Sequence, residues 1–243
     1  MSNNTKEHLV VCLGASIMRG QVSSNFIEVL AERMKEDGYR FINQAVAGYE
    51  AYNVLIHLDS AINLKPDYVV ILVGTNDVAA TLNPKTARLS RLTKKLPQSH
   101  SAQFYCDNIL QIVRTLKENT SAKIGLISLP VLGEDLESLP NQRIREYNAI
   151  LRRIAEQEQI EYLPVYEHQE EYLKNNQSKA GRPFEGGLRP SLMLLLRHYI
   201  LRQSFDTISK KNGYALVTDG IHLNSQGAAF IADEIELFLR GGY

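Results

Sequence analysis

Residues 68–77, YVVILVGTND, decide the fold, because six apolar residues run directly into a glycine and three polar residues. A short, continuous apolar run rich in β-branched residues is typical of a strand buried on both faces of a sheet. Residues 9–16, LVVCLGAS, have the same pattern, with five apolar residues followed by Gly14, Ala15 and Ser16. Both runs therefore predict buried parallel strands that end in short polar turns.

The chain on either side of these runs alternates between strand and helix patterns. Further strands are predicted at 40–46, 123–128 and 160–163, and amphipathic helices at 23–35, 52–64, 102–117, 141–156 and from Asn224 or Ser225 onward. Such alternation predicts a parallel sheet covered by helices on both faces. In sheets of this kind the functional site lies beyond the carboxyl ends of the strands.

Composition restricts the class of protein. Lys and Arg number 27, as do Asp and Glu, and a net charge of zero argues against a nucleic-acid-binding protein. Two cysteines, Cys12 and Cys106, are too few for a disulfide framework or a structural zinc site. The N-terminus does not read as a signal peptide, and apolar runs such as 192–196 are far too short to cross a bilayer. A soluble cytoplasmic protein without a transmembrane segment is therefore the default expectation.

Short polar segments occupy the places where this architecture predicts a site. Ser16 follows the first predicted strand, Gly48 the second and Asn76 the third. Asp219 and His222 lie just before the last predicted helix. Taken singly, each is most simply interpreted as a turn or helix-cap residue.

Together, the same residues are the parts of a nucleophilic site. An aspartate three residues before a histidine can accept a hydrogen bond from the imidazole, which leaves the other ring nitrogen free to act as a base. A serine hydroxyl needs such a base to attack near neutral pH. The backbone N–H groups of Ser16 and Gly48 and the amide of Asn76 could stabilise the developing oxyanion. Glycine at position 48 would let the backbone approach without a side chain in the way.

In this order, the segments resemble the SGNH hydrolases, also called GDSL esterases and lipases. The resemblance rests on four blocks: LGASI at 13–17, NQAVAG at 43–48, VGTND at 73–77 and DGIHLN at 219–224. It covers most of the chain except about 80–101 and 175–213. One residue departs from the family pattern, because Ala15 stands where the family usually has an aspartate that helps to hold the nucleophile loop.

The resemblance implies an α/β fold, a flavodoxin-like three-layer α/β/α sandwich with about five parallel strands, in one domain over residues 1–243. It implies a serine esterase that works through an acyl-enzyme, without metal or cofactor. Ser16 would be the nucleophile, His222 the base and Asp219 its partner. Ser16, Gly48 and Asn76 would form the oxyanion hole. Candidate substrates are carboxylic esters of short or medium acyl chains, then lysophospholipids or acyl thioesters, and lastly acetylated sugars.

Two segments fall outside the resemblance. Residues 78–106 carry five cations and no acid, and the sequence predicts a basic loop at 80–101. That loop is either merely solvated or a flap whose Arg88 and Arg91 attract an anionic group of the substrate. Residues 188–203, LRPSLMLLLRHYILRQ, predict an apolar helix that packs on the body, covers an acyl pocket or forms a homo-oligomer interface. The candidates for those acyl or interface contacts are Leu192, Met193, Leu196 and Tyr199.

The alternative to an esterase is a flavodoxin-like binding module, or a catalytically silent scaffold. A glycine-bearing turn before a helix can bind anions. However, GASIMRG at 14–20 matches neither the dinucleotide-binding pattern nor the P-loop pattern, and this alternative gives Asp219 and His222 no role. The expected partner is therefore a small-molecule or lipid ester rather than a nucleic acid.

Overall fold

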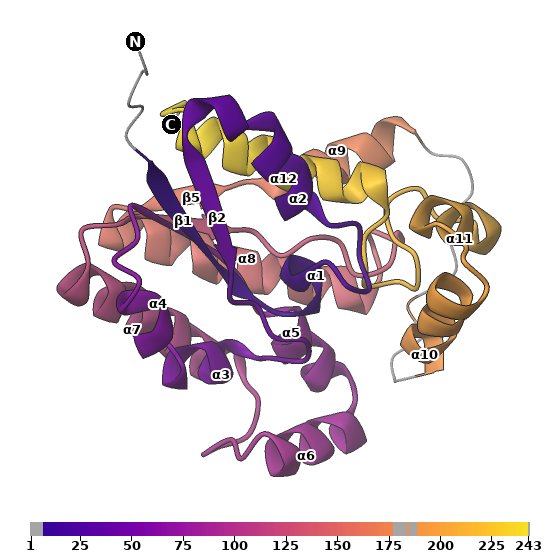
Figure 1. Ribbon diagram of the computed structural model, residues 1–243. Helices are drawn as coiled ribbons and strands as arrows, with labels where there is room; N and C mark the ends of the chain where they lie inside the picture. The colour runs from indigo at the N-terminus through magenta and orange to yellow at the C-terminus, as the bar shows by residue number, and fades with distance from the viewer. Residues whose placement is uncertain (1–6, 177–183, 185–188, 243) are drawn as a thin grey trace.

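One sheet of five parallel strands forms the centre of the protein (Figure 1). The computed structural model describes residues 7–176, 184 and 189–242. The strand order is β2-β1-β3-β4-β5. The strand bounds are His8–Gly14 for β1, Tyr39–Asn43 for β2, Tyr68–Leu72 for β3, Lys123–Ile127 for β4 and Glu161–Leu163 for β5. This is the flavodoxin-like order, so the predicted fold class is confirmed.

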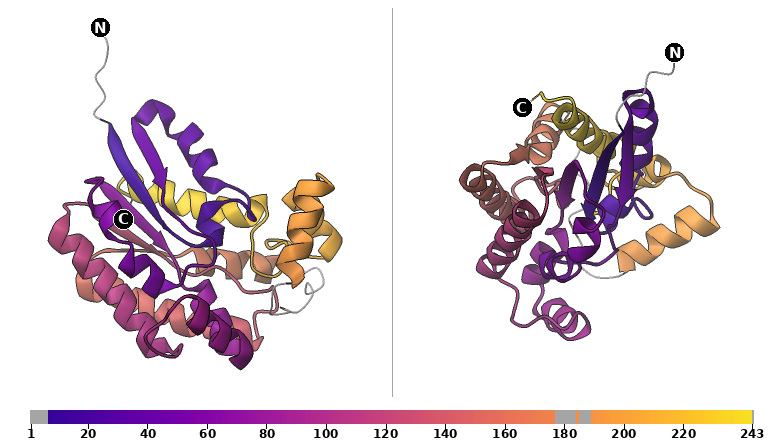
Figure 2. Two further views of the ribbon diagram at one scale, coloured as in Figure 1. Left: turned by 60° about the horizontal axis from the view of Figure 1, so that its bottom comes forward. Right: turned by 60° about the vertical axis from the view of Figure 1, so that its left-hand side comes forward.

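Helices cover both faces of the sheet, giving the three layers seen in Figures 1 and 2. On one face, α12 (Ser225–Leu239) packs against α2 (Phe26–Arg33) and α9 (Val165–Asn175). On the other, α7 (Ala102–Asn119) packs against α3 (Ala51–Ile56) and α8 (Leu139–Glu158). The shorter helices are α1 (Ser16–Arg19), η1 (Lys35–Asp37), α4 (Asp59–Ile62), α5 (Thr75–Leu82), α6 (Pro84–Thr93), α10 (Arg189–Leu195), η2 (Leu196–Ile200) and α11 (Phe205–Asn212).

The core lies between the sheet and these helix layers. Val10, Val11 and Cys12 in β1 and Val69 and Val70 in β3 are completely buried, as the continuous apolar runs predict. Burial raises the pKa of the Cys12 thiol to about 12, because the thiolate would lose its hydration. This cysteine therefore acts as a small core residue rather than as a nucleophile.

The predicted basic loop at 80–101 is wrong, because more than half of it is helical: α5 ends at Leu82, and α6 spans Pro84–Thr93. Asn83 caps this helix by accepting hydrogen bonds from the backbone N–H groups of Lys85 and Thr86, and Pro84 is its first residue. Proline suits that position, where its missing N–H costs no helical hydrogen bond. Because many positions of this segment are cationic, its apolar periodicity is weak, and a prediction from periodicity alone overlooks the cap at Asn83 and the proline at position 84.

Several predicted helix boundaries also differ from the structure. The predicted helix 52–64 is two short helices, α3 and α4, separated by His57 and Leu58. Helices α9 and α11 were not predicted, and the apolar segment 188–203 contains α10 followed by the π-helical turn η2. No helix within the described ranges combines the length and the apolar character needed to cross a membrane.

Candidate active site

Three of the predicted site residues form a hydrogen-bonded chain beyond the carboxyl ends of the strands. Nε2 of His222 lies 3.0 Å from Oγ of Ser16, although the two residues are 206 positions apart in the sequence. Nδ1 of His222 lies 2.9 Å from Oδ2 of Asp219. Ser16 opens α1 directly after β1, and the other two residues lie in the loop before α12.

The loop that carries Asp219 and His222 is a tight turn stabilised by its own groups. Oδ1 of Asp219 accepts hydrogen bonds from the backbone N–H groups of Ile221 at 3.1 Å and His222 at 2.9 Å. Gly220 has a φ of +94°, which a glycine adopts without strain. Thr218 closes the turn, because its N–H donates to the carbonyl of His222 at 2.7 Å. One carboxylate oxygen thus shapes the turn, and the other faces the imidazole.

The Asp219 carboxylate is buried, with only 3% of its side chain exposed. Burial by itself raises the pKa of Asp219, but the charge and ring hydrogen bond of His222 lower it, as do the backbone N–H groups of His222 and Ile221. The resulting pKa lies below the ordinary value of 3.8. Asp219 therefore carries its negative charge at neutral pH, directly beside the imidazole.

Ser23 connects the segment after Ser16 to the loop that carries His222. Oγ of Ser23 accepts a hydrogen bond from the N–H of Leu223 at 2.7 Å. The N–H of Ser24 donates in turn to the carbonyl of Leu223 at 3.0 Å. The segment after α1 is therefore fastened to the residue that follows His222, which holds the Ser16 and His222 side chains in register.

Asn43 supports the turn that carries Ser16, in which Ala15 stands where the sequence resemblance leads us to expect an aspartate. Ala15 caps α1 without any side-chain hydrogen bond. Asn43, at the end of β2, donates from Nδ2 to the carbonyl of Met18 at 3.0 Å and accepts from the N–H of Ala45 at 3.0 Å. These bonds connect α1 to the loop after β2, so the turn is held from the neighbouring strand.

The three predicted oxyanion donors lie in the turns that follow β1, β2 and β3. Nδ2 of Asn76 donates one hydrogen bond to the carbonyl of Tyr49 at 2.8 Å, and its second N–H stays available. Among the described residues, the N–H groups of Ser16 and Gly48 have no protein acceptor. Gly48 has a φ of +82°, and a Cβ there would meet no atom within 4 Å. Backbone conformation, rather than lack of space, therefore explains this glycine.

Tyr105 on α7 fixes the turn that carries Asn76. Its hydroxyl donates to the carbonyl of Val73 at 2.9 Å. Gly74 has a φ of +138°, and a Cβ there would lie 2.6 Å from the Tyr105 hydroxyl oxygen. The ring can pack against this turn only because residue 74 has no side chain.

Sequence reasoning missed Glu50, which lies two residues after Gly48 and is the centre of a buried polar cluster. Its side chain is 1% exposed. It accepts hydrogen bonds from Ser90 and from Lys94, the latter at 2.6 Å, and it pairs with Nε2 of His100 at 2.9 Å. These contacts attach α6 and the residues before α7 to the loop of Gly48. One feature of the sequence could have pointed to Glu50. Residues 78–106 contain cations but no acid, so any ion pair that they form within the chain needs an acid from another segment.

A second buried carboxylate, that of Asp77, lies beside this cluster. Both of its oxygens accept from the N–H of Ala51, at 3.3 and 3.2 Å. Burial and the negative charge of Glu50 raise the pKa of Asp77 well above its ordinary value, and the Ala51 bond lowers it only in part. Asp77 thus joins the start of α5, which carries Asn76, to the start of α3.

The Glu50→Gln variant should lose about 3 kcal/mol of unfolding free energy at pH 7. Burial opposes ionisation of Glu50, but His100, Lys94 and Ser90 lower its pKa from 4.5 to about 2. Because the folded pKa is lower than the unfolded one, the stabilisation is complete above pH 4.5 and disappears as the pH falls towards 2. Urea denaturation should show the difference between wild type and variant shrinking to about 1 kcal/mol at pH 3.

The matched control for this measurement is Glu32→Gln, because Glu32 is an exposed acid on α2. We expect that control to change stability by less than about 0.5 kcal/mol at either pH. A Glu50→Gln deficit of equal size at pH 7 and pH 3 would contradict the electrostatic explanation.

The predicted substrate-binding residues lie on two elements that flank the carboxyl ends of the strands, α6 and the segment α10–η2 (Figure 1). Arg88 and Arg91 are exposed on α6. In the described part of the chain, neither arginine is bonded to Ser16, Asp219 or His222. The exposed apolar side chains of α10 and η2 include Leu192, Met193, Leu196 and Tyr199.

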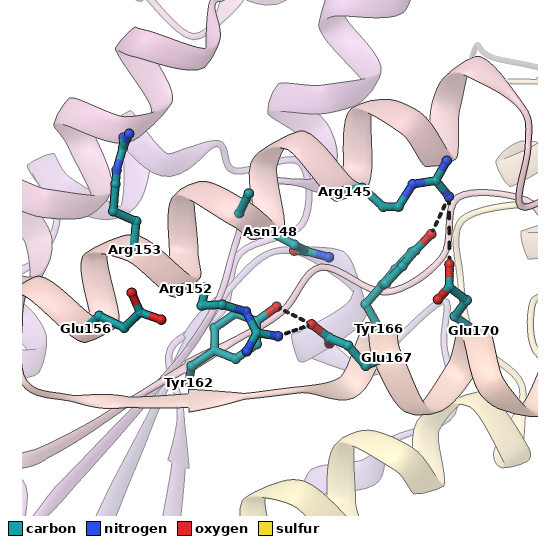
Figure 3. A pocket seen from close by; sticks show the side chains of 10 residues that line it. Arg145, Asn148, Arg152, Arg153, Glu156, Tyr162, Tyr166, Glu167 and Glu170 are labelled. Atoms are coloured by element: carbon teal, nitrogen blue, oxygen red, sulfur yellow. Dashed lines mark hydrogen bonds and ion pairs between the residues drawn. The ribbon is translucent and has the colours of Figure 1, made fainter.

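A cavity of about 340 Å³ lies between α8, β5 and α9, and it contains none of the predicted site residues (Figure 3). Several of the charged side chains that line this cavity form ion pairs with one another. Arg152 pairs with Glu167 at 2.6 Å, and the hydroxyl of Tyr162 also donates to that carboxylate. Arg145 contacts Glu170 at 3.9 Å. We therefore place the candidate active site at Ser16 rather than in this cavity.

Comparisons with known proteins identify the family. The model of the GDSL-like lipase/acylhydrolase family matches residues 12–230. No curated protein matches the chain. Similar solved structures include an acetyl xylan esterase, AlAXEase, with 20% identity, a TM-score of 0.68 and coverage of 95% of this chain and 99% of that one.

Two further structures have the same fold. Axe2, an acetylxylan esterase from Geobacillus stearothermophilus, has 16% identity, a TM-score of 0.67 and coverage of 96% and 93% of the two chains. LAE5, an alpha/beta hydrolase enzyme from the metagenome of Lake Arreo in Spain, has 18% identity, a TM-score of 0.65 and coverage of 96% and 95%. Because the family match spans most of the sequence, the chain belongs to the GDSL-like lipase/acylhydrolase family and is an ester hydrolase of the SGNH type.

Proposed function

We propose that Ser16, His222 and Asp219 are the catalytic triad of a carboxylic ester hydrolase that works through an acyl-enzyme. The observation that carries this proposal is the unbroken chain from Ser16 Oγ to His222 Nε2 and from His222 Nδ1 to Asp219 Oδ2, at 3.0 and 2.9 Å. Both distances lie within hydrogen-bonding range for a nucleophile, its base and the group that orients the base.

In the first half of the reaction, Ser16 Oγ attacks the carbonyl carbon of the ester while its proton moves to His222 Nε2. The protonated His222 gives this proton to the oxygen of the leaving alcohol, and the acyl group stays on Ser16. In the second half, His222 takes a proton from water, which attacks the acyl carbon, and His222 then returns this proton to Ser16 Oγ as the acyl–oxygen bond breaks and the acid is released. Asp219 stabilises the imidazolium in both halves.

The oxyanion formed in each half would be stabilised by the N–H groups of Ser16 and Gly48 and by Nδ2 of Asn76. Support for this assignment comes from the unused donors of all three groups. The hydrogen bond from Asn76 to Tyr49 restricts the amide, so its remaining N–H needs little reorganisation to meet developing charge.

The substrate class that we propose is esters of short acyl chains. Two similar structures are of acetyl xylan esterases, which makes acetyl esters the first substrates to test. Lysophospholipids and longer acyl chains are a second proposal. For them, Arg88 and Arg91 on α6 would attract the anionic group, and the exposed apolar residues of α10 and η2 would contact the acyl chain.

A series of p-nitrophenyl esters, from acetate to palmitate, tests this proposal. We expect kcat/KM to be highest between acetate and butyrate and to fall with longer chains. A maximum at octanoate or beyond would contradict the short-acyl assignment and support acyl contacts with Leu192, Met193, Leu196 and Tyr199. If no ester in the series is hydrolysed and Ser16 does not react with a fluorophosphonate, the catalytically silent alternative is correct.

A further inference from the structure

Ser191, on α10, makes a hydrogen bond to the carboxylate of the proposed triad. Its Oγ donates to Oδ2 of Asp219 at 2.9 Å. The same oxygen accepts from Nδ1 of His222, also at 2.9 Å. Ser191 belongs to the segment 175–213, outside the four blocks that resemble the family. A residue of the accessory segment therefore contacts the atom that orients the base.

This contact differs in kind from the other hydrogen bonds to the carboxylate. Ile221 and His222 donate from their backbone N–H groups to Oδ1, and both belong to the same turn as Asp219. Within the described part of the chain, Ser191 is the donor to Asp219 that comes from outside this turn. Because it bonds to Oδ2, it withdraws charge from the oxygen that faces the imidazole.

We propose that Ser191 is a positioning residue, which holds Asp219 Oδ2 in place and moderates its charge, so that the docking of α10 completes the triad. This inference rests on the proposed function, because it assigns a role to Ser191 only through Asp219 and His222. It makes the segment α10–η2 a part of the catalytic apparatus rather than only a cover or an interface.

A second contact shows that the segment spans the site. The hydroxyl of Tyr199, in η2, donates to the carbonyl of Gln21 at 2.7 Å. Gln21 lies just after α1, which begins at Ser16. The segment is thus attached to the turn of Asp219 near one end and to the chain after the nucleophile near the other, and α10 lies beside this end of the sheet (Figures 1 and 2).

Other titratable groups near this turn are already engaged. Glu134 accepts hydrogen bonds from the N–H groups of Ala215, Leu216 and Val217. The hydroxyl of Tyr214 lies beside Gly220. The titratable group that faces Asp219 directly is His222, and Ser16 lies on the far side of His222. Removal of the Ser191 hydroxyl leaves all of these groups in the protein, so it isolates the effect on Oδ2.

The Ser191→Ala variant should lower kcat for p-nitrophenyl acetate about tenfold at pH 7, with KM unchanged. Without the serine donor, Oδ2 keeps more negative charge and stabilises the imidazolium more strongly. The variant then needs a higher pH to form the unprotonated base, so the acidic limb of the plot of kcat/KM against pH should shift to higher pH by about half a unit. The variant should therefore lose more activity at pH 6 than at pH 8.

Two further variants separate positioning from a purely structural role. Ser204→Ala makes the same change in the same segment, because Ser204 caps α11 by accepting a hydrogen bond from the N–H of Thr207 and, within the described ranges, has no hydrogen bond to the proposed triad. It should leave the acidic limb where it is in the wild type. Ser191→Thr keeps the hydroxyl and should restore both kcat and the limb, whereas Ser191→Val, with the same shape, should behave like Ser191→Ala. If Ser191→Ala folds poorly, the comparison of Ser191→Thr with Ser191→Val still tests the role of the hydroxyl.

The inference is overturned if Ser191→Ala or Ser191→Val has the wild-type pH profile, or if threonine does not restore it. Ser16→Ala, assayed in parallel, keeps this failure separate from failure of the proposed function. If Ser16→Ala is active, the triad itself is wrongly assigned. If Ser16→Ala is inactive and Ser191→Ala matches Ser204→Ala, only the role of Ser191 is wrong.

Discussion

Ser16→Ala should reduce kcat for p-nitrophenyl acetate by about 10⁶-fold. The substitution removes the oxygen that would form the acyl-enzyme, and in the part of the chain that the structure describes His222 Nε2 is bonded to no other hydroxyl. The hydroxyl contacts only Nε2 of His222 among the described residues, so its loss should leave the fold unchanged. Steady-state kinetics and thermal unfolding of both proteins test these two expectations.

A fluorophosphonate probe makes the same prediction independent of substrate choice. It should label the wild-type protein with one equivalent of probe. This labelling should be absent in Ser16→Ala and unchanged in Ser24→Ala. Ser24 is a good control because it lies close in sequence, and its backbone rather than its hydroxyl bonds to Leu223. Equal labelling of wild type and Ser16→Ala would show that a different residue is the nucleophile.

Asp219→Asn should lower kcat by about 10⁴-fold, although the side chain keeps its shape. The backbone N–H groups of Ile221 and His222 require an acceptor at the Oδ1 position, so the amide oxygen must take that place. The NH₂ group then points at Nδ1 of His222. That nitrogen must become the acceptor, which moves the ring proton to Nε2, where it prevents proton removal from Ser16.

The pH profile and a surface control make this test specific. Asp233→Asn changes an exposed aspartate on α12 that pairs with Arg33, and it should leave kcat within about twofold of wild type. A loss smaller than tenfold in Asp219→Asn would mean that another group orients His222. A large loss that is partly reversed at high pH, where hydroxide can attack without the base, would agree with the tautomer argument.

The sequence predicted the parts of the fold that depend on local pattern. The runs at 9–13 and 68–73 are apolar on both faces because β1 and β3 lie in the centre of the sheet. The parallel order then brings the turns after these strands together, which is why Ser16 and Asn76 could be assigned to one site. The shortest helices were predicted poorly, since α1 and α4 are each about one turn long and leave little periodicity to detect.

Contacts between distant elements could not be predicted in the same way. Glu50 meets Lys94 and His100 only because α6 folds back on the loop after β2. Ser191 meets Asp219 only because α10 docks beside the turn of Asp219 and His222. In a single sequence, neither pairing has a spacing that distinguishes it from many others, so the contacts that position the site became visible only in three dimensions.

The 206-residue separation between Ser16 and His222 affects the order in which activity can arise during synthesis. The neighbours of β1 in the sheet are β2 and β3, so the strand that precedes Ser16 has both of its partners once β3 has been made. His222, the proposed base, follows only after α11 has been made. A growing chain therefore carries Ser16 without its proposed base until position 222 has been translated, and the proposed triad can form only after that point.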